Sequence, residues 1–527
     1  MTKSIMLQGT GSHVGKSVLV AALCRILKQD GYKVAPFKSQ NMALNSFVTK
    51  DGGEMGRAQV VQAEAAGLEP HVDMNPILLK PTGQASSQVV VLGKSIGNLS
   101  ARRYHQEWTT KALDIIEGAY GRLTAAHEVM VIEGAGSPAE VNLKATEIVN
   151  MRIAKLTNSP VLLVGDIDKG GVLASLVGTL ELLEPEERDL VAGFIINKFR
   201  GDVSLFQPAI EFLEQKTGKP VLGVIPYFQG FKVQEEDSIP EDEGIRPGLE
   251  QQMQQIEIVV MRLPHVSNFT DFDPLADEPD VHLRYVNIGQ NIGNPDLIIL
   301  PGSKNTIEDL VALEKAGFAE RIRQLAADGT AIIGICGGYQ MLGWQIHDPL
   351  HTESAIPSVR GLGLLDMSTT FEPEKITSQV EAVIAGTGPF FAGLEDQEVT
   401  GYEIHMGRTE LGGDTSPAFR LVSRSNQAID LPDGGVSSNG WVFGTYLHGI
   451  FDNDGFRRNI INVLRQRKGL AVLDGLDGLS VQQQRDRDYD KLAQVVRDNL
   501  NLPLLYQIMD LGEKSDVTLE GDQTCMG

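Results

Sequence analysis

The amino-acid sequence predicts an α/β protein with two successive domains, each built around a mainly parallel sheet. The chain has 527 residues, which is too long for one small domain. In both halves, short apolar runs alternate with stretches of helical periodicity, a pattern typical of βαβ units. An acidic stretch that lacks this alternation, residues 230–255, lies between the halves and predicts a boundary there.

The first half begins with the apolar run SIMLQG, which precedes a predicted helix through LVAALCRILKQDG. The strands expected after that helix are YKVAPF, EVMVIEG, PVLLVGD, LVAGFIINK and PVLGVIP. Apolar runs of about five to seven residues between helical segments indicate strands that are buried on both faces of a parallel sheet.

In the second half the expected strands are QIEIVVMRL, DVHLRYVNI, DLIILPG, TAIIGICGG, LGLLDM, QVEAVIAG and WVFGTYLHG. Glycine or proline closes several of these runs, and a helix over residues 307–327 fits between two of them. We expect another helix from Asp454 through FRRNIINVLRQRKG and one over about residues 485–499. The residues from Gly512 onward lack apolar periodicity and are expected to form a mobile tail.

Composition argues against several classes of protein. The formal net charge of −23 opposes binding to nucleic acid or to an anionic membrane. Cys24, Cys336 and Cys525 are too widely spaced for a disulfide framework or a paired-cysteine metal site, so we expect a reducing compartment. The first apolar run is too short for a signal peptide or a membrane span, and we expect a cytoplasmic protein. Nothing in the sequence assigns an oligomeric state.

A phosphate-binding loop is predicted near the N-terminus. The run SIMLQGTGSHVGKS has the order strand, glycine-rich loop and helix start that a P-loop requires. Backbone N–H groups between Gly9 and Gly15, including that of Thr10, can surround phosphates. The Lys16 ammonium can neutralise the β and γ oxygens, and the Ser17 hydroxyl can bind Mg²⁺. Five residues separate the two outer glycines, where the standard pattern has four.

A magnesium–nucleotide site also needs a carboxylate from outside the loop, because Mg²⁺ prefers hard oxygen ligands. Glu133 ends the apolar run VMVIEG and is expected at the same edge of the sheet as the loop, so it is the first candidate. The other candidates are Asp166, Asp168, Asp51 and Glu54. Each of these acids can equally be a solvated or helix-capping side chain.

A second site is predicted where the strand TAIIGI meets a helix. Gly-x-Cys-Gly-Gly around Cys336 is the cysteine counterpart of the nucleophile elbow, in which small neighbours allow a strained turn at a helix N-terminus. The helix field there favours a thiolate. The N–H of Gly337 can stabilise an oxyanion, together with a second donor from LPGSKNT, either Gly302 or Ser303.

A thiolate nucleophile needs an imidazole as its base. His448 follows the apolar run WVFGTYL directly and can reach the same sheet edge, and His405 in GYEIHMGRT is the alternative. Together, a nucleotide loop and an acyl-transfer thiol in one chain imply two coupled half-reactions, of which one activates a carboxylate and the other releases a nucleophile.

These motifs carry a resemblance to known families. GTGSHVGKS with VIEGAG resembles the dethiobiotin synthetase branch of P-loop enzymes, where the extra loop residue is usual, and GICGGYQML with LHG resembles class I glutamine amidotransferase domains. Both halves together resemble the cobyric acid synthase family. The segments that carry this resemblance are QNMALNS, DGGEMGRAQ, DMNPILLKP, GDIDKGGVLASLVGTL, HVSNFTDFDPL and YEIHMGRT. The resemblance implies a P-loop parallel-sheet domain followed by a flavodoxin-like amidotransferase domain.

The resemblance also implies an activity. Members of the family use ATP, Mg²⁺ and glutamine to amidate four side-chain carboxylates (b, d, e and g) of adenosylcobyrinic acid a,c-diamide, which gives adenosylcobyric acid. By motif, Cys336 is then the nucleophile and His448 the general base. The corrinoid is a substrate and no prosthetic group is expected, since no histidine lies in a D-x-H-x-x-G arrangement. Ile450 stands where ordinary class I enzymes have a glutamate, so the partner that orients the imidazole is unassigned.

The expected domain limits follow from the boundary and the resemblance. They are a synthetase domain (1–230), an acidic linker (231–255), an amidotransferase domain (256–455), a C-terminal helical segment (456–511) and a tail (512–527).

Two competing interpretations remain: a sister amidotransferase such as cobyrinic acid a,c-diamide synthase, and a ParA-like partitioning ATPase. QNMALNS and DMNPILLKP argue against the first, and the thiol elbow argues against the second.

Overall fold

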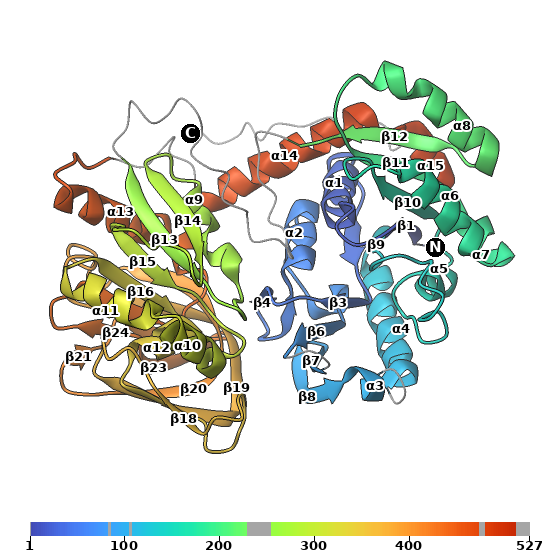
Figure 1. Cartoon of the computed structure of the whole chain (residues 1–527). Coiled ribbons are helices and arrows are strands. Elements are labelled where there is room, and N and C mark those ends of the chain that lie inside the picture. The colour runs from blue at the N-terminus through green and yellow to red at the C-terminus, as the bar shows by residue number, and fades with distance from the viewer. Residues whose placement is uncertain (1, 83–85, 105–107, 229–254, 474–479, 513–527) are drawn as a thin grey trace, which may run out of the picture.

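The computed structural model describes residues 2–82, 86–104, 108–228, 255–473 and 480–512. The expected linker lies outside the described residues except for Gln255, and the expected tail lies outside them except for Gly512. Two α/β halves stand side by side, with the short strand β4 (Ser46–Val48) reaching from the first half toward the second (Figure 1). No helix in the described part of the chain combines the length and the apolar character needed to cross a bilayer.

The first half is built on a six-stranded parallel sheet whose strands match the apolar runs of the sequence. In spatial order the strands are β12 (Val221–Pro226), β11 (Val191–Phe199), β10 (Val161–Asp166), β1 (Lys3–Gly9), β9 (Val129–Glu133) and β2 (Val34–Phe37). The helices between them are α1 (Lys16–Gln29), α4 (Thr109–Ala126), α5 (Met151–Thr157), α6 (Val172–Leu182), α7 (Pro185–Leu190) and α8 (Gln207–Thr217). Because all strands are parallel, every strand's carboxyl end lies at one edge of the sheet.

A smaller antiparallel layer, which the sequence pattern did not predict, follows β2. It contains β3 (Gln40–Met42), β6 (Ile77–Pro81), β7 (Ser86–Val91) and β8 (Lys94–Ser100), of which only the β3–β6 pair is parallel. A separate hairpin pairs β4 with β5 (Glu54–Gly56), which runs directly into α2 (Arg57–Ala66). The motif QNMALNS lies in β3 and β4, and this layer carries it toward the second half.

The second half has a seven-stranded sheet with five parallel strands. In spatial order these are β14 (Val281–Asn287), β13 (Ile256–Arg262), β15 (Leu297–Leu300), β16 (Ala331–Ile335) and β25 (Val442–Thr445), followed by the antiparallel β24 (Gly435–Ser437) and β21 (Thr415–Ser416). The single helix expected over 307–327 is two helices, α10 (Thr306–Lys315) and α11 (Phe318–Ala327). The break occurs because Gly317 takes a left-handed conformation with φ of 76°.

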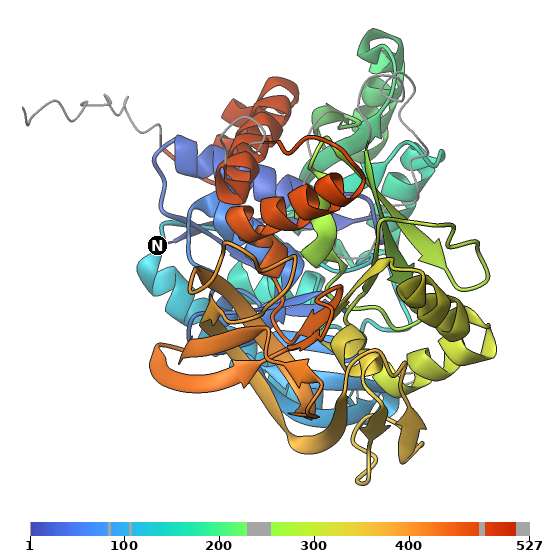
Figure 2. The same ribbon diagram turned by 90° about the vertical axis from the view of Figure 1, so that its left-hand side faces the viewer.

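A second antiparallel layer packs on this half and was not foreseen, since the run QVEAVIAG was assigned to a further α/β layer. That run belongs to the long strand β19 (Met367–Ile384), which pairs with β20 (Glu398–Leu411). The other strands of the layer are β17 (Gln345–His347), β18 (Ser358–Arg360), β22 (Phe419–Arg424) and β23 (Gln427–Asp433). Figure 2 views the molecule from the side on which this orange layer lies in front.

The C-terminal helices divide between the two halves. Helix α13 (Asp454–Arg467) covers the second half, where Arg458 and Arg465 pair with the buried carboxylate of Asp280. Helices α14 (Val481–Asn499) and α15 (Leu502–Ile508) return to the first half, and Figure 1 shows α14 spanning both halves. Arg25 of α1 pairs with Asp490 of α14 at 2.7 Å, so the end of the chain is attached to the helix that follows the phosphate-binding loop.

Candidate active sites

The phosphate-binding loop occupies the turn from β1 to α1. Gly15 is the N-cap of α1 and has a φ of 95°, and a Cβ atom there would lie 2.2 Å from the side-chain nitrogen of Asn197. Both facts require glycine at this position. The N–H of Thr10 donates to Val164 O at 3.0 Å, which attaches the start of the loop to β10. The amides at the start of α1 therefore face the carboxyl edge of the sheet, where a phosphate can be bound.

Lys16, Ser17 and Glu133 lie together in this loop region, as the sequence predicted they would. The Lys16 ammonium donates to Gly11 O at 2.9 Å and to Gly136 O at 3.3 Å. The Ser17 hydroxyl donates to Glu133 Oε1 at 2.8 Å, and the ammonium of Lys38 lies 2.8 Å from the same oxygen. The carboxylate of Glu133 ends β9 and is buried.

The electrostatics of the pocket keep Glu133 ionised. Burial by itself raises the pKa of this carboxyl, but the charge and hydrogen bond of Lys38 oppose it, aided by a hydrogen bond from Gln62 and the charge of Lys16. The net result is a pKa below the ordinary value. A buried carboxylate with a hydroxyl against it is the oxygen pair that Mg²⁺ prefers.

Buried acceptor atoms around the loop support a magnesium–nucleotide ligand. The side-chain oxygens of Gln8, Gln62 and Asn197 are buried and have no hydrogen-bond partner in the described part of the protein. Unsatisfied buried acceptors are costly, so their grouping around one loop indicates a site that a polar ligand completes. No cluster of three or more His, Cys, Asp or Glu side chains suited to a metal occurs among the described residues, and Mg²⁺ bound through phosphates needs none.

The other carboxylate candidates have different surroundings. Asp51 is exposed in the β4–β5 turn, and its carboxylate accepts from the Thr49 hydroxyl. Glu54 lies at the boundary between the halves, with Lys80 and Lys375 as partners. Asp166 ends the strand β10 at the loop edge and Asp168 follows it in the turn, where Lys198 pairs with Asp166 and Arg200 with Asp168. Only Glu133 of the predicted acids contacts Ser17 in the described structure.

The thiol of Cys336 sits on a strained turn between β16 and α12 (Gly337–Leu342). Cys336 has φ of 52° and ψ of −107°, a conformation that non-glycine residues rarely adopt. A Cβ atom on Gly338 would come within 1.9 Å of Leu300 O, so the helix can approach β15 only with glycine there. This is the geometry of a nucleophile elbow, which presents a side chain at the carboxyl edge of a sheet.

His448 reaches the thiol from the end of β25, and a carboxylate orients it. Its ring Nδ1 lies 2.6 Å from Asp271 Oδ2, and the backbone N–H of Gly449 donates to the other carboxylate oxygen at 3.2 Å. Tyr402 stacks on the imidazole with ring centroids 5.3 Å apart. His448 and Cys336 line the same cavity, and the thiol itself donates to Ile404 O at 3.5 Å.

The surroundings of His448 favour its protonated form. Burial lowers the pKa of His448, but the charges of Asp271 and Cys336 and the hydrogen bond with Asp271 outweigh this effect and raise the pKa to about 10. The imidazolium is therefore favoured at neutral pH as long as these two partners remain beside it. An imidazolium beside a cysteine sulfur is the arrangement that activates a thiolate nucleophile.

The loop after β15 lies against His448 and against Gly337, the residue that follows the thiol. A Cβ atom on Gly302 would lie 3.2 Å from His448 Cε1, and one on Gly337 would lie 2.9 Å from Ser303 N. Asp309 fixes this loop, because its carboxylate accepts from the Ser303 hydroxyl at 2.6 Å. The predicted oxyanion donors, Gly337 and the 302–303 segment, are thus brought to one place next to the thiol.

His405, the alternative base, is held by other partners. Its Nδ1 lies 2.8 Å from Gly407 O and its Nε2 lies 3.3 Å from Glu403 Oε1. Its ring also stacks on Tyr446 with centroids 3.7 Å apart. Although His405 lines the cavity of the thiol, both ring nitrogens are engaged, which favours His448 as the base.

Asp271 is the functional residue that the sequence analysis missed. It lies in the 3₁₀ turn Phe269–Phe272, within the motif HVSNFTDFDPL that had been noted only for its resemblance. The first half positions this turn: the side chain of Asn45 accepts from Phe269 N, and Asn268 accepts from Ser46 N, both at 3.1 Å. QNMALNS therefore contacts the segment that carries the histidine's partner.

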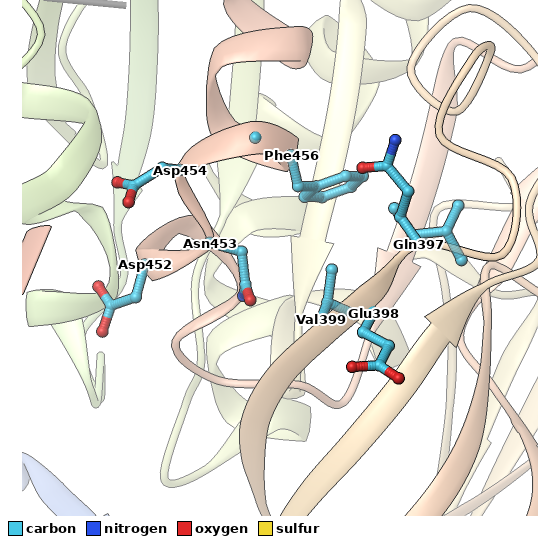
Figure 3. A pocket seen from close by; sticks show the side chains of 9 residues that line it. Gln397, Glu398, Val399, Asp452, Asn453, Asp454 and Phe456 are labelled. Carbon is cyan, nitrogen blue, oxygen red and sulfur yellow. The ribbon is translucent and has the colours of Figure 1, made fainter. Parts of the chain in front are cut away.

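A separate cavity of about 420 Å³ lies where β20 begins and α13 starts (Figure 3). Two of its three carboxylates have partners, because Asp452 pairs with Arg485 and Asp454 pairs with Arg457. Neither the thiol nor the phosphate loop lines it. We assign no chemistry to this cavity.

Comparisons with known proteins match both halves. Residues 5–240 match the CobQ/CobB/MinD/ParA nucleotide binding domain, and residues 257–456 match the CobB/CobQ-like glutamine amidotransferase domain. The chain is 56% identical over 511 residues to the cobyric acid synthase of Moorella thermoacetica, covering 97% of this chain and 98% of that protein. It is 55% identical over 514 residues to that of Pelotomaculum thermopropionicum, covering 97% of each. With a nucleotide-binding half, an amidotransferase half and this identity over nearly its whole length, the chain belongs to the cobyric acid synthase family.

Proposed function

We propose that the chain catalyses glutamine-dependent amidation in cobalamin biosynthesis by two coupled half-reactions at the two sites described above. The substrate is adenosylcobyrinic acid a,c-diamide, whose b, d, e and g carboxylates become amides with ATP as the energy source. The observation that carries the proposal is the presence in one chain of an oriented Cys336–His448–Asp271 group and a Lys16–Ser17–Glu133 phosphate site.

Glutamine hydrolysis would proceed through a thioester on Cys336. The sulfur attacks the γ-carboxamide carbon while N–H groups at Gly337 and Gly302 stabilise the oxyanion. His448 holds the thiol proton and gives it to the leaving ammonia, and it then takes a proton from the water that hydrolyses the thioester. Asp271 keeps the imidazole in the required tautomer and orientation throughout.

Carboxylate activation would take place at the phosphate loop. A corrinoid carboxylate oxygen attacks the γ-phosphorus of ATP, ADP leaves, and ammonia then displaces phosphate from the acyl phosphate. Lys16 balances the charge on the β and γ oxygens, and Ser17 with Glu133 would hold Mg²⁺. When bound, the magnesium ion supplies charge stabilisation between those phosphate oxygens.

Replacement of His448 by alanine should lower glutamine-dependent amidation by roughly 10²-fold or more, because the thiol loses both its base and the acid for the leaving group. Asp271→Asn should lower it by roughly 10²- to 10⁴-fold by allowing the wrong tautomer. Steady-state glutaminase assays measure both effects, with amidation from free ammonia as the internal control.

Both variants should retain amidation from free ammonia, since neither residue touches the phosphate site. His405→Ala is the informative comparison, because this histidine lines the same cavity but has both ring nitrogens engaged. A selective loss of glutaminase in His405→Ala, with none in His448→Ala, would show that the base is assigned to the wrong histidine.

The acyl phosphate can be tested with a corrinoid substrate that carries ¹⁸O in its carboxylates. Attack of that oxygen on the γ-phosphorus and later displacement by ammonia must transfer the label to the released phosphate. Mass spectrometry of the products should therefore find ¹⁸O in inorganic phosphate, with ADP as the nucleotide product. Label in AMP, or in neither product, would rule out this step.

A further inference from the structure

The cavity of the thiol has a wall of three lysines contributed by both halves. Lys304 and Lys375 come from the second half and Lys80 from the first, and all three line the cavity together with Cys336 and His448. Only two of these three lysines have a carboxylate partner among the described residues. The two carboxylate oxygens of Glu54 are divided between Lys80 and Lys375, at 2.6 and 2.5 Å.

Of the three lysines, Lys304 has only a neutral hydrogen-bond partner among the described residues. Its Nζ donates to the side-chain oxygen of Gln88 at 3.1 Å, and it forms no ion pair with any described residue. Gln88 belongs to β7 of the first half, so the contact bridges the two halves. Lys304 follows Ser303 directly, and it therefore extends from the same loop that lies against Gly337 and His448.

Charges around the cavity favour the entry of an anion near Lys304. Burial lowers the pKa of Lys304, and the neighbouring charges of Lys375 and Lys80 lower it further, beyond what Glu54 and Glu353 compensate. Burial also raises the pKa of the Glu353 carboxyl, which weakens the negative charge that this side chain places beside Lys304. A bound carboxylate would stabilise the charged form of Lys304.

The position of the wall relative to the thiol identifies which carboxylate fits. In a glutamine whose neutral γ-carboxamide reaches Cys336, the single anionic group is the α-carboxylate, at the far end of a short aliphatic chain. The cavity itself is about 50 Å³ and is smaller than an amino acid. Binding therefore requires side chains of the wall to move, which long lysine side chains can do.

We propose that Lys304 binds the α-carboxylate of glutamine, an inference that rests on the proposed glutaminase function. The first half holds the lysine wall of the pocket in place through Gln88 and the Glu54–Lys80 pair. Lys304 thereby selects primary amides that carry a carboxylate over those that lack one. The glutamine pocket is then complete only when the two halves are docked, because Lys80 of β6 lines it and Gln88 of β7 accepts a hydrogen bond from Lys304.

The test is the full-length Lys304→Met variant with three amides: L-glutamine, glutaramic acid, which lacks only the amino group, and 4-aminobutanamide, which lacks only the carboxylate. We expect KM for glutamine and for glutaramic acid to rise about 10- to 100-fold, the usual effect of losing a hydrogen bond to a charged group. The kcat/KM for 4-aminobutanamide should stay within about twofold of the wild type, and Lys304→Arg should restore much of the loss.

Two controls make the result decisive. Lys315→Met, at the end of α10, should leave all three amides unaffected, and amidation from free ammonia should be unchanged in Lys304→Met. An equal loss with all three amides would show that Lys304 only positions its loop, and a loss of ammonia-dependent amidation would place its role outside the glutamine pocket. Either result overturns the inference about Lys304 without contradicting the proposed glutaminase function of the wild type. A wild-type protein that hydrolyses no glutamine would refute the proposed function itself.

Discussion

Cys336→Ser should abolish amidation from glutamine and leave amidation from free ammonia at its wild-type rate. The serine hydroxyl at this elbow is a far weaker nucleophile than a thiolate paired with His448, so glutaminase activity should fall by at least about 10³-fold. The phosphate site is formed by β1, α1 and β9 of the first half and does not include this thiol. Product analysis of the corrinoid with each nitrogen source measures the selectivity.

Cys24→Ala is the matched control for the loss of a thiol. Cys24 is fully buried in α1, and burial raises the pKa of its thiol, so it is unreactive. This variant should retain both activities and should still incorporate one thiol-directed glutamine analogue at Cys336. If Cys336→Ser lost ammonia-dependent and glutamine-dependent amidation equally, the separation into two sites would be refuted.

Lys16→Ala should give the opposite pattern and stop amidation from glutamine and from ammonia alike. Its ammonium stands over the loop with Gly11 O and Gly136 O as partners, where it can balance charge that develops on the β and γ phosphate oxygens. We expect a loss of at least about 10²-fold in the amidation rate with either nitrogen source. Release of ADP and phosphate measures the activation step independently.

Glutaminase activity in Lys16→Ala tests whether the two sites act separately. Hydrolysis of glutamine should persist there, because Cys336, His448 and Asp271 remain in place. Lys28→Ala is the control, since this lysine lies in the exposed last turn of the same helix and should affect neither reaction. Normal amidation from ammonia in Lys16→Ala would contradict the assignment of the phosphate site.

Local sequence was sufficient to predict the two loops and the strands that lead into them. Gly15-Lys16-Ser17 and Cys336-Gly337-Gly338 are short segments whose geometry depends on neighbouring residues, such as the left-handed Gly15 and the close packing of Gly338. Glu133 and the loop could be paired because strands of a parallel sheet end at a common edge.

Features that depend on contacts between distant segments could not be predicted from local sequence patterns. The antiparallel layer of β19 and β20 was expected to be a further α/β layer, because one apolar run does not reveal the direction of its pairing partner. The helix expected over 307–327 is broken because a single Gly317 adopts a left-handed conformation inside a run that keeps its apolar periodicity. Asp271 resembled any surface acid in the sequence, 177 residues away from the histidine that it orients.

The sequence by itself therefore determined the strands of the two parallel sheets, the phosphate-binding loop, the thiol turn and the family to which the motifs point, because a strand–glycine–helix turn is specified by residues adjacent in the chain. The tertiary structure alone decided which carboxylate orients His448, and that Lys80, Lys304 and Lys375 meet around one cavity. Such contacts arise where β5, β6 and β7 of the first half dock against β19 and the loop after β15 of the second. The physical reason is that burial and charge pairing between distant segments depend on how the halves pack, which no local periodicity encodes.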